Sequence, residues 1–158
     1  MSLTVKITAP IFEKLSDLKE EYGFNELGLA VSGGSDSLAM LYICNDWAQK
    51  NKVKLHCLTV DHKLRFESAK EAELVANHCS GLGINHEIVE WKHEGNISGN
   101  LSDSARSARY KLIDKWRKEL SFVLVGHTKN DQIETFFMNL KRGSGIEGLK
   151  GMPLSFKR

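Results

Sequence analysis

Apolar residues recur along the chain with two kinds of spacing, and the two kinds alternate from one segment to the next. Four segments carry continuous or every-second apolar residues, which predicts β-strands. These segments are 26–31, 53–60, 84–91 and 122–126. Five longer segments predict helices, several of them with apolar residues three or four positions apart. They are 9–24, 37–50, 67–83, 102–120 and 130–142, with Pro10 expected near the start of the first, where proline is tolerated.

Strands that alternate with helices indicate a mostly parallel sheet. Two of the predicted strands are nearly all apolar, as expected where helices cover both faces of the sheet. The pattern therefore predicts one α/β domain with a Rossmann-like, doubly wound sheet. We expect its core to span residues 9–142, and the glycine-rich residues 143–158 to form a mobile tail.

Three short polar segments come directly after three of the predicted strands, at 32–37, 61–65 and 126–131. In parallel sheets of this kind, ligands bind beyond the carboxyl ends of the strands. If the fold is correct, the three segments converge on one crevice.

The first of these segments is Ser32-Gly33-Gly34-Ser35-Asp36-Ser37. Its two glycines can adopt positive φ and bring the backbone close to a ligand. The amides of 34–38 are expected at a helix N-terminus, where free N–H groups and the helix dipole favour an anion. With the hydroxyls of Ser32, Ser35 and Ser37, the segment predicts a phosphate cradle.

This segment differs from two better-known phosphate loops. No lysine comes after the glycines, as a Walker loop requires, and the GxGxxG pattern is absent. A carboxylate beside phosphates is explained if Asp36 holds Mg²⁺. The alternative is an ordinary tight turn in which a serine or Asp36 caps the next helix.

Composition narrows the classes of protein. No apolar run is long enough for a membrane helix and no signal-type stretch opens the chain, so we expect a cytoplasmic protein. The three cysteines (Cys44, Cys57 and Cys79) form no CxxC pair and are expected to be buried thiols. Residues 109–158 hold 11 Lys and Arg against 5 Asp and Glu, whereas residues 1–108 hold 11 against 15. The basic half fits either an anionic partner such as nucleic acid or a solvated surface.

The loop SGGSDS resembles the PP-loop of the N-type ATP pyrophosphatases, which cleave ATP to AMP and pyrophosphate while they adenylate a substrate. Three further segments narrow the resemblance by their order and spacing. They are VDHKLR (60–65), ARSARYKL (105–112) and GHTKNDQIETFFMNLKRGSGIEGLKGM (126–152). Together, over residues 25–153, the chain is similar to the N-terminal catalytic domain of the tRNA(Ile)-lysidine synthetases.

That resemblance implies ATP and Mg²⁺ as cofactors, and the isoleucine tRNA with a CAU anticodon and free L-lysine as substrates. The implied enzyme adenylates C2 of cytidine-34, after which the ε-amine of lysine attacks C2 and expels AMP. Members of this family continue well beyond the segment matched here, so we expect the chain to be truncated relative to them. The oligomeric state stays open, with a homodimer as one option.

The resemblance also gives roles to residues near the last predicted helix. Asp131 and Glu134 are three positions apart and share a helix face, so they could hold the ammonium group of lysine or accept a proton from it. They could also simply complement the helix dipole. His127 ends the fourth strand and suits proton transfer or a phosphate contact.

The remaining candidates are cations and strand-end residues. Arg109 and Arg142 are expected to meet phosphates or the adenylated intermediate, whereas Arg65 and Arg106 fit that role and surface ion pairs equally well. Asp61 is expected to flank the adenosine and contact its ribose hydroxyls. His62 is expected to line the nucleotide site.

Two alternative functions stay open. One is a PP-loop tRNA thiolase, against which the absence of CxxC argues. The other is a non-catalytic module that binds adenine nucleotides, against which the acids Asp36, Asp131 and Glu134 argue.

Overall fold

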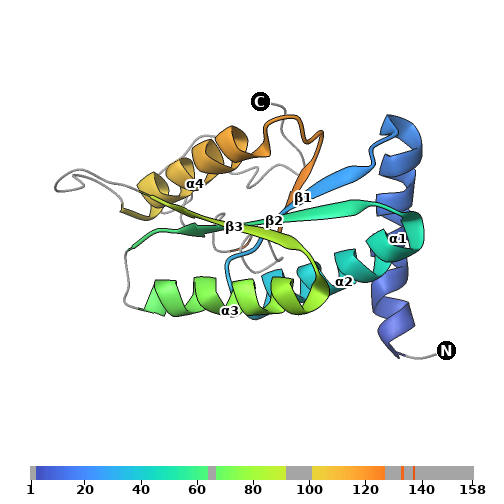
Figure 1. Cartoon of the computed structure of the whole chain (residues 1–158), viewed down its shortest axis with the longest axis horizontal. Helices are drawn as coiled ribbons and strands as arrows, with labels where there is room; N and C mark the ends of the chain where they lie inside the picture. The colour runs from blue at the N-terminus through green and yellow to red at the C-terminus, as the bar shows by residue number, and fades with distance from the viewer. Residues whose placement is uncertain (1–2, 64–66, 92–100, 127–132, 134–136, 138–158) are drawn as a thin grey trace. The chain divides into compact units, whose positions relative to one another are not determined.

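A computed structural model gives the three-dimensional structure of the chain (Figure 1). It describes residues 3–63, 67–91, 101–126, 133 and 137, without side-chain detail for 3–7, 67 and 101–104. The helices are α1 (Leu3–Tyr22), α2 (Ser35–Asn51), α3 (Glu67–Leu82) and α4 (Leu101–Arg117). The strands are β1 (Glu26–Ala30), β2 (Lys54–Asp61), β3 (Asn85–Glu90) and β4 (Val123–Val125).

The four strands form one parallel sheet in the order β3-β2-β1-β4. From β1 the chain moves outward through β2 to β3, and it then returns to the other side of β1. This reversal puts a topological switch point between β1 and β4, which is where ligands bind in sheets of this type. The arrangement confirms the predicted Rossmann-like fold.

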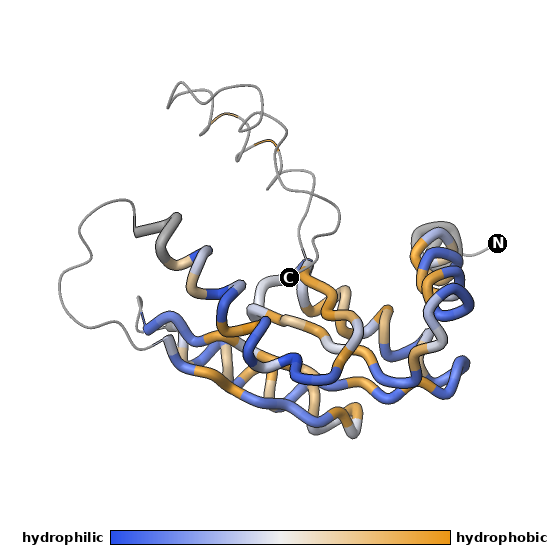
Figure 2. Tube along the Cα trace, turned by 90° about the horizontal axis from the view of Figure 1, so that it is seen from above, coloured by the Kyte–Doolittle hydropathy of each residue, from blue (hydrophilic) through white to orange (hydrophobic). Residues whose placement is uncertain are grey.

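Helices cover both faces of the sheet: α2 and α3 lie on one face and α4 on the other (Figure 1). Every second residue of β1 and β2 points to the α2–α3 face and is buried there, as Leu27, Leu29 and Leu55 show. Leu41 and Trp47 of α2 complete that core and are also buried. Both hydrophilic and hydrophobic residues occur in α1 (Figure 2).

The opposite face is packed closely because β1 places a glycine there. A Cβ on Gly28 would lie 3.0 Å from Val123, 3.1 Å from Trp116 and 3.2 Å from Leu120. The absence of a side chain at position 28 thus lets the end of α4 approach the sheet.

Two local expectations are wrong. Helix α1 begins at Leu3, so Pro10 lies inside it and not near its start. Proline has no backbone N–H and therefore cannot donate a helical hydrogen bond at this position. Helix α2 begins at Ser35 and not at position 37. On the same helix, Tyr42 is 44% exposed, and its hydroxyl forms a hydrogen bond with Nδ1 of His78 on α3, 2.7 Å away.

The chain divides into two units, Met1–Val125 and Gly126–Arg158. Almost all of the second unit lies outside the described residues, including most of the predicted helix 130–142 and the whole of the tail 143–158. The single-domain organisation therefore stays a prediction, and the candidate site is built from residues of the first unit.

Candidate nucleotide site at the carboxyl edge of the sheet

The loop between β1 and α2 lies at the carboxyl edge of the sheet, next to the switch point. Strand β1 is flanked by β2 and β4: its last residue, Ala30, pairs with Leu58 and Val125, and β2 continues three residues further to Asp61. The first two of the predicted polar segments, 32–37 and 61–65, therefore begin side by side at one edge. The third, 126–131, lies outside the described residues except for Gly126.

Gly33 adopts a conformation that other residues avoid, with φ +86°. Its missing side chain also makes room for α3, since a Cβ would lie 3.0 Å from the Cβ of Glu71 and 3.1 Å from its carbonyl oxygen. Gly34 has φ −70°, which any residue can adopt, and a Cβ there would meet nothing nearer than the hydroxyl of Ser32 at 3.9 Å. Gly33 is thus required by the fold, whereas the space around position 34 is open.

Ser37 holds the loop in shape from within. Its hydroxyl donates to the carbonyl oxygen of Gly34 (2.9 Å) and accepts from the N–H of Ser32 (3.2 Å), and the residue is only 4% exposed. The amide of Leu38 donates to the same carbonyl oxygen, 3.0 Å away. This corrects the expected set of free amides, 34–38, because Leu38 is already part of the helix. The amides of residues 35–37 precede the first helical bond and have no acceptor within the helix.

Asp36 lies in the first turn of α2, and its side chain is exposed beside these amides. Within the described residues no group of three or more His, Cys, Asp or Glu side chains could hold a metal ion by itself. A single exposed carboxylate nevertheless fits Mg²⁺, which is usually bound through one or two carboxylates together with substrate phosphates and water. The donor set therefore fits a metal that arrives with a nucleotide.

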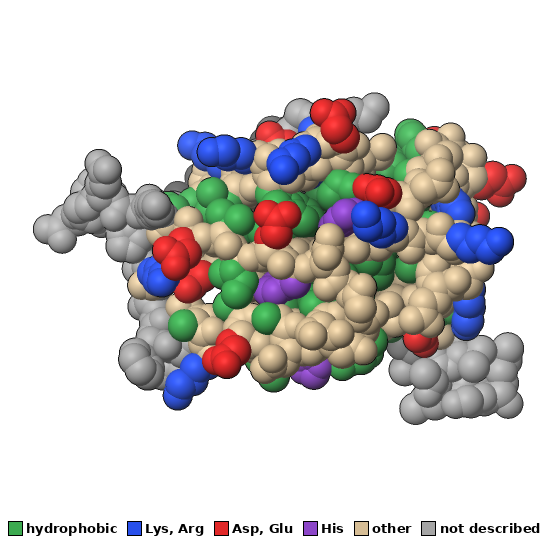
Figure 3. All heavy atoms as spheres, viewed as in Figure 1, with side chains coloured by type: hydrophobic (Ala, Val, Ile, Leu, Met, Phe, Trp, Pro, Cys, Tyr) green, Lys and Arg blue, Asp and Glu red, His purple; other side chains and the backbone are tan. Residues whose placement is uncertain are grey.

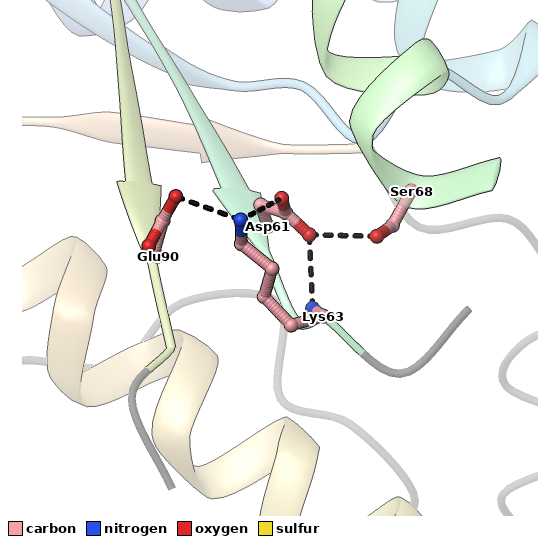
Figure 4. Close-up of polar contacts among 4 residues, drawn as sticks. All are labelled: Asp61, Lys63, Ser68 and Glu90. Atoms are coloured by element: carbon pink, nitrogen blue, oxygen red, sulfur yellow. Dashed lines mark hydrogen bonds and ion pairs between the residues drawn. The ribbon is translucent and has the colours of Figure 1, made fainter. Parts of the chain in front are cut away.

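Asp61 is the last residue of β2, and its carboxylate is bound by neighbouring protein groups (Figure 4). Its Oδ1 accepts from the N–H of Lys63 (2.9 Å) and from the hydroxyl of Ser68 on α3 (2.7 Å). The ammonium group of Lys63 lies 3.8 Å from Oδ2 and 2.9 Å from Oε1 of Glu90. Asp61 thus ties together the ends of β2 and β3 and the start of α3.

Two opposing effects act on the pKa of Asp61. Burial raises it, but the N–H of Lys63, the hydroxyl of Ser68 and the charge of Lys63 outweigh burial, so the pKa lies below its usual value. The carboxylate is 5% exposed and stays ionised. Its observed role is to fix the strand-end loop, and the expected ribose contact remains a prediction.

His62 connects this edge to α4. Its Nε2 accepts a long hydrogen bond from Nε of Arg109, 3.4 Å away. The ring of Trp91 stands edge-on to the imidazole, with centroids 5.8 Å apart and an angle of 84°. Burial, and secondarily the charge of Arg109, lowers the pKa of His62, and the opposing effect of Asp61 is smaller. The structure therefore joins two residues that the sequence had singled out separately.

Charge on the described surface is mixed. Acidic and basic side chains are interspersed on the face shown in Figure 3. Arg106 lies with its guanidinium 5.9 Å from the ring centroid of Tyr110. Both interpretations of the basic half, an anionic partner and a solvated surface, are therefore compatible with the charges on this face.

Five of the predicted site residues lie outside the described residues: Arg65, His127, Asp131, Glu134 and Arg142. Their roles stay predictions. Conversely, four residues that belong to the edge were not predicted from the sequence: Lys63, Ser68, Glu71 and Trp91. Only Lys63 had a usable signal in the sequence. The side chain of an aspartate often accepts a hydrogen bond from the backbone N–H two residues later, in an Asx turn, and Lys63 comes two residues after Asp61.

The loop and the parallel sheet define a nucleotide-binding α/β domain of the PP-loop class. A family profile described as a PP-loop domain matches residues 7–158, and the chain belongs to this family. Membership implies that the domain uses ATP.

Several curated proteins with similar sequences are all named tRNA(Ile)-lysidine synthase. The tRNA(Ile)-lysidine synthase of Wolbachia pipientis wMel is 46% identical over 132 residues, which cover 81% of this chain and 30% of the relative. That of Ruegeria pomeroyi is 46% identical over 128 residues, covering 80% and 30%. The enzyme of Rickettsia bellii is 38% identical over 144 residues, covering 90% and 33%. The chain thus spans about a third of the length of these relatives.

Solved structures support the fold alone. A U34-tRNA thiolase from Methanococcus maripaludis superposes with a TM-score of 0.68 at 21% identity, covering 78% of this chain and 46% of the other. An NH3-dependent NAD synthetase from Campylobacter jejuni gives a TM-score of 0.59 at 16% identity, covering 95% and 77%. Among the described residues, no helix has both the length and the hydropathy needed to cross a membrane.

Proposed function

We propose that this chain is the catalytic part of a tRNA(Ile)-lysidine synthase. In this proposal it uses ATP to adenylate C2 of cytidine-34 in the isoleucine tRNA with a CAU anticodon. The amine of free L-lysine then displaces AMP, and pyrophosphate is the other product. The observation that carries the proposal is the loop after β1, whose free amides and open Gly34 lie at the switch point of a chain similar to these enzymes over most of its length.

The described residues have distinct tasks in this reaction. The amides of residues 35–37 would bind phosphate oxygens, because a helix N-terminus favours anions. Asp36 would hold a Mg²⁺ ion, whose charge neutralises the departing pyrophosphate. Arg109 would stabilise negative charge on the α-phosphate from the side of α4.

The predicted residues beyond β4 would complete the site. Asp131 or Glu134 would bind the lysine ammonium or accept its proton, His127 would move a proton or contact phosphate, and Arg142 would meet the intermediate. These assignments rest on the resemblance of the motif and not on geometry.

The alternative of a tRNA thiolase has the fold in its favour, since one of the solved neighbours is such an enzyme. The cysteines argue against it. All three are buried, and burial raises the pKa of Cys44 to about 12, which leaves that thiol protonated and unreactive at neutral pH.

The test is incubation of the protein with ATP, Mg²⁺, radiolabelled lysine and unmodified tRNA. Label that enters the tRNA together with released AMP and pyrophosphate supports the proposal. Pyrophosphate release that needs a sulfur donor and not lysine would instead identify a thiolase. ATP binding without cleavage would identify a non-catalytic module.

A further inference from the structure

Arg109 and His62 come from different layers of the molecule and meet at the carboxyl edge. Arg109 lies on α4, on one face of the sheet, and His62 comes directly after β2. They are 47 residues apart in the sequence. The contact therefore depends on the tertiary fold, and it ties the helix to the strand end.

The direction of this hydrogen bond determines the state of the imidazole. The Nε–H of arginine can only donate, so Nε2 of His62 must accept and carries no proton. The proton of the neutral ring is then on Nδ1. Among the described residues, this Nδ1 is the one buried side-chain nitrogen or oxygen atom that has no hydrogen-bond partner. A neutral imidazole in one tautomer is therefore kept at this position even though its second nitrogen is left unsatisfied.

Burial is the main cause that keeps His62 neutral, and two charged side chains act on it in opposite directions. Arg109 faces it from α4, and Asp61 faces it from β2. The carboxylate of Asp61 is engaged by Lys63 and Ser68, and Lys63 in turn pairs with Glu90 of β3. The charge of Asp61 raises the pKa of His62, but burial of the imidazole and the charge of Arg109 outweigh it, so the pKa lies below its ordinary value.

We propose that neutral His62 is a positioning residue, which orients the Arg109 guanidinium at the carboxyl edge and releases it when the imidazole is protonated. A protonated ring has no acceptor for the Nε–H of arginine, and the two cations repel each other. With Nε fixed by His62, the terminal nitrogens of Arg109 hold a set direction for a phosphate. This inference deepens the proposed function and rests on it for the identity of the phosphate ligand.

The first experiment needs no ligand. In protein labelled with ¹⁵N, the His62 resonances at pH 8 should show the proton on Nδ1, and the Nε–H of Arg109 should be protected from exchange. That protection should be lost as pH falls below 6.5 and His62 becomes protonated. His62→Gln keeps a carbonyl acceptor and removes the titration, so protection should persist at low pH. His62→Phe should abolish it at every pH.

The second experiment measures affinity for Mg-ATP over the same pH range. We expect about tenfold weaker binding for His62→Phe throughout, since one orienting hydrogen bond is lost. His62→Gln should bind as the parent does at pH 8 and should lack its decline at low pH. The matched control is His86→Gln, because His86 also has a pKa lowered by burial but bonds to Thr59 (2.9 Å) and not to an arginine. Its affinity and its Arg109 signal should match those of the parent.

Two results would overturn the inference. One is protection of the Arg109 Nε–H that changes neither with pH nor in His62→Phe. The other is a loss of Mg-ATP affinity in His86→Gln as large as that in His62→Phe. Failure of the parent protein to bind ATP at all would instead overturn the proposed function, and the NMR experiment would still decide whether His62 positions Arg109.

Discussion

Gly33 and Glu71 are in such close contact that position 33 has no room for a side chain. A Cβ there would lie 3.1 Å from the carbonyl oxygen of Glu71, and the backbone φ of +86° is unfavourable for other residues. The loop between β1 and α2 is thus shaped partly by α3, which packs against it at Gly33.

The first prediction compares the two glycines of the loop. Gly33→Ala should lower the free energy of unfolding by about 2 kcal/mol and the Tm by several degrees, because it combines strain with overpacking. Gly34→Ala should leave the Tm unchanged, since its φ is ordinary and the space is open. It should nevertheless weaken ATP binding, because the methyl group stands where the ligand approaches. Calorimetric unfolding and ATP titration measure both effects, and equal Tm losses in the two variants would contradict the prediction.

The second prediction concerns the serines of the same loop. Ser37→Ala removes the acceptor of the Ser32 N–H and the donor to Gly34, and should cost about 1–2 kcal/mol of stability. Ser35→Ala is the matched control, because Ser35 is exposed and lies two residues before Ser37 in the same turn of α2. We expect urea unfolding of the control to stay within about 0.5 kcal/mol of the parent. If the control loses as much stability as Ser37→Ala, the internal hydrogen bonds are not what holds the loop.

The third prediction concerns pH. Because the pKa of Asp61 is lower in the folded protein than its ordinary value of 3.8, the ionised carboxylate stabilises the fold above that pH, and this contribution is lost as pH falls through the folded pKa. Asp61→Asn should therefore be less stable than the parent near neutrality, and the difference should shrink in acid. Urea unfolding at several pH values measures it. Ser68→Ala, which removes one of the donors that lower the pKa, should move the acid transition of the parent to higher pH. Parallel pH curves for the parent and Asp61→Asn would refute this role.

The fourth prediction tests the packing of α4 against the sheet. Gly28→Ala would place a methyl group 3.0 Å from Val123 and 3.1 Å from Trp116, and should cost about 1–3 kcal/mol of stability. Gly81→Ala, in the last turn of α3 with nothing within 4 Å, should instead add about 0.4–1 kcal/mol. Opposite signs of the two changes in Tm are expected, and destabilisation by both would show that the contacts around Gly28 are not the cause.

Much of the fold could be read from the sequence because it depends on local periodicity. The apolar spacing gave the order and type of all eight described elements, and parallel strands necessarily bring their ends to one edge. The loop after β1 was recognisable because small residues at a strand-to-helix junction have few other uses. Helix boundaries were less accurate, as at Pro10 and Ser35, because a helix start depends on how its first N–H groups, which lack partners within the helix, are satisfied.

The contacts that shape the site could not be read in this way. Glu71 touches Gly33, and Ser68 binds Asp61, through the packing of α3 on the sheet, and no sequence spacing announces either pair. The ribose contact of Asp61 was predicted because this residue ends a strand, and it stays a prediction; the bonds of its carboxylate to Lys63 and Ser68 could not be predicted. Whether such an acid faces a ligand or its own loop depends on partners that only the tertiary structure supplies.

The last prediction separates two roles of Asp36, as a support for Mg²⁺ or as a helix-dipole partner. If the carboxylate holds Mg²⁺, Asp36→Ala should weaken ATP binding about tenfold or more in the presence of Mg²⁺. Without Mg²⁺, the same variant should bind ATP as well as the parent or better, because the carboxylate then only repels the phosphates. Asp46→Ala, which removes an exposed carboxylate further along α2, should change neither affinity. If Asp36 only complements the helix dipole, the variant should lose about 0.3–1 kcal/mol of stability, and the effect of Mg²⁺ on ATP affinity should equal that in the parent. Calorimetric ATP titrations with Mg²⁺ and with EDTA distinguish the two roles, since only the first reverses or removes the effect when the metal is withdrawn.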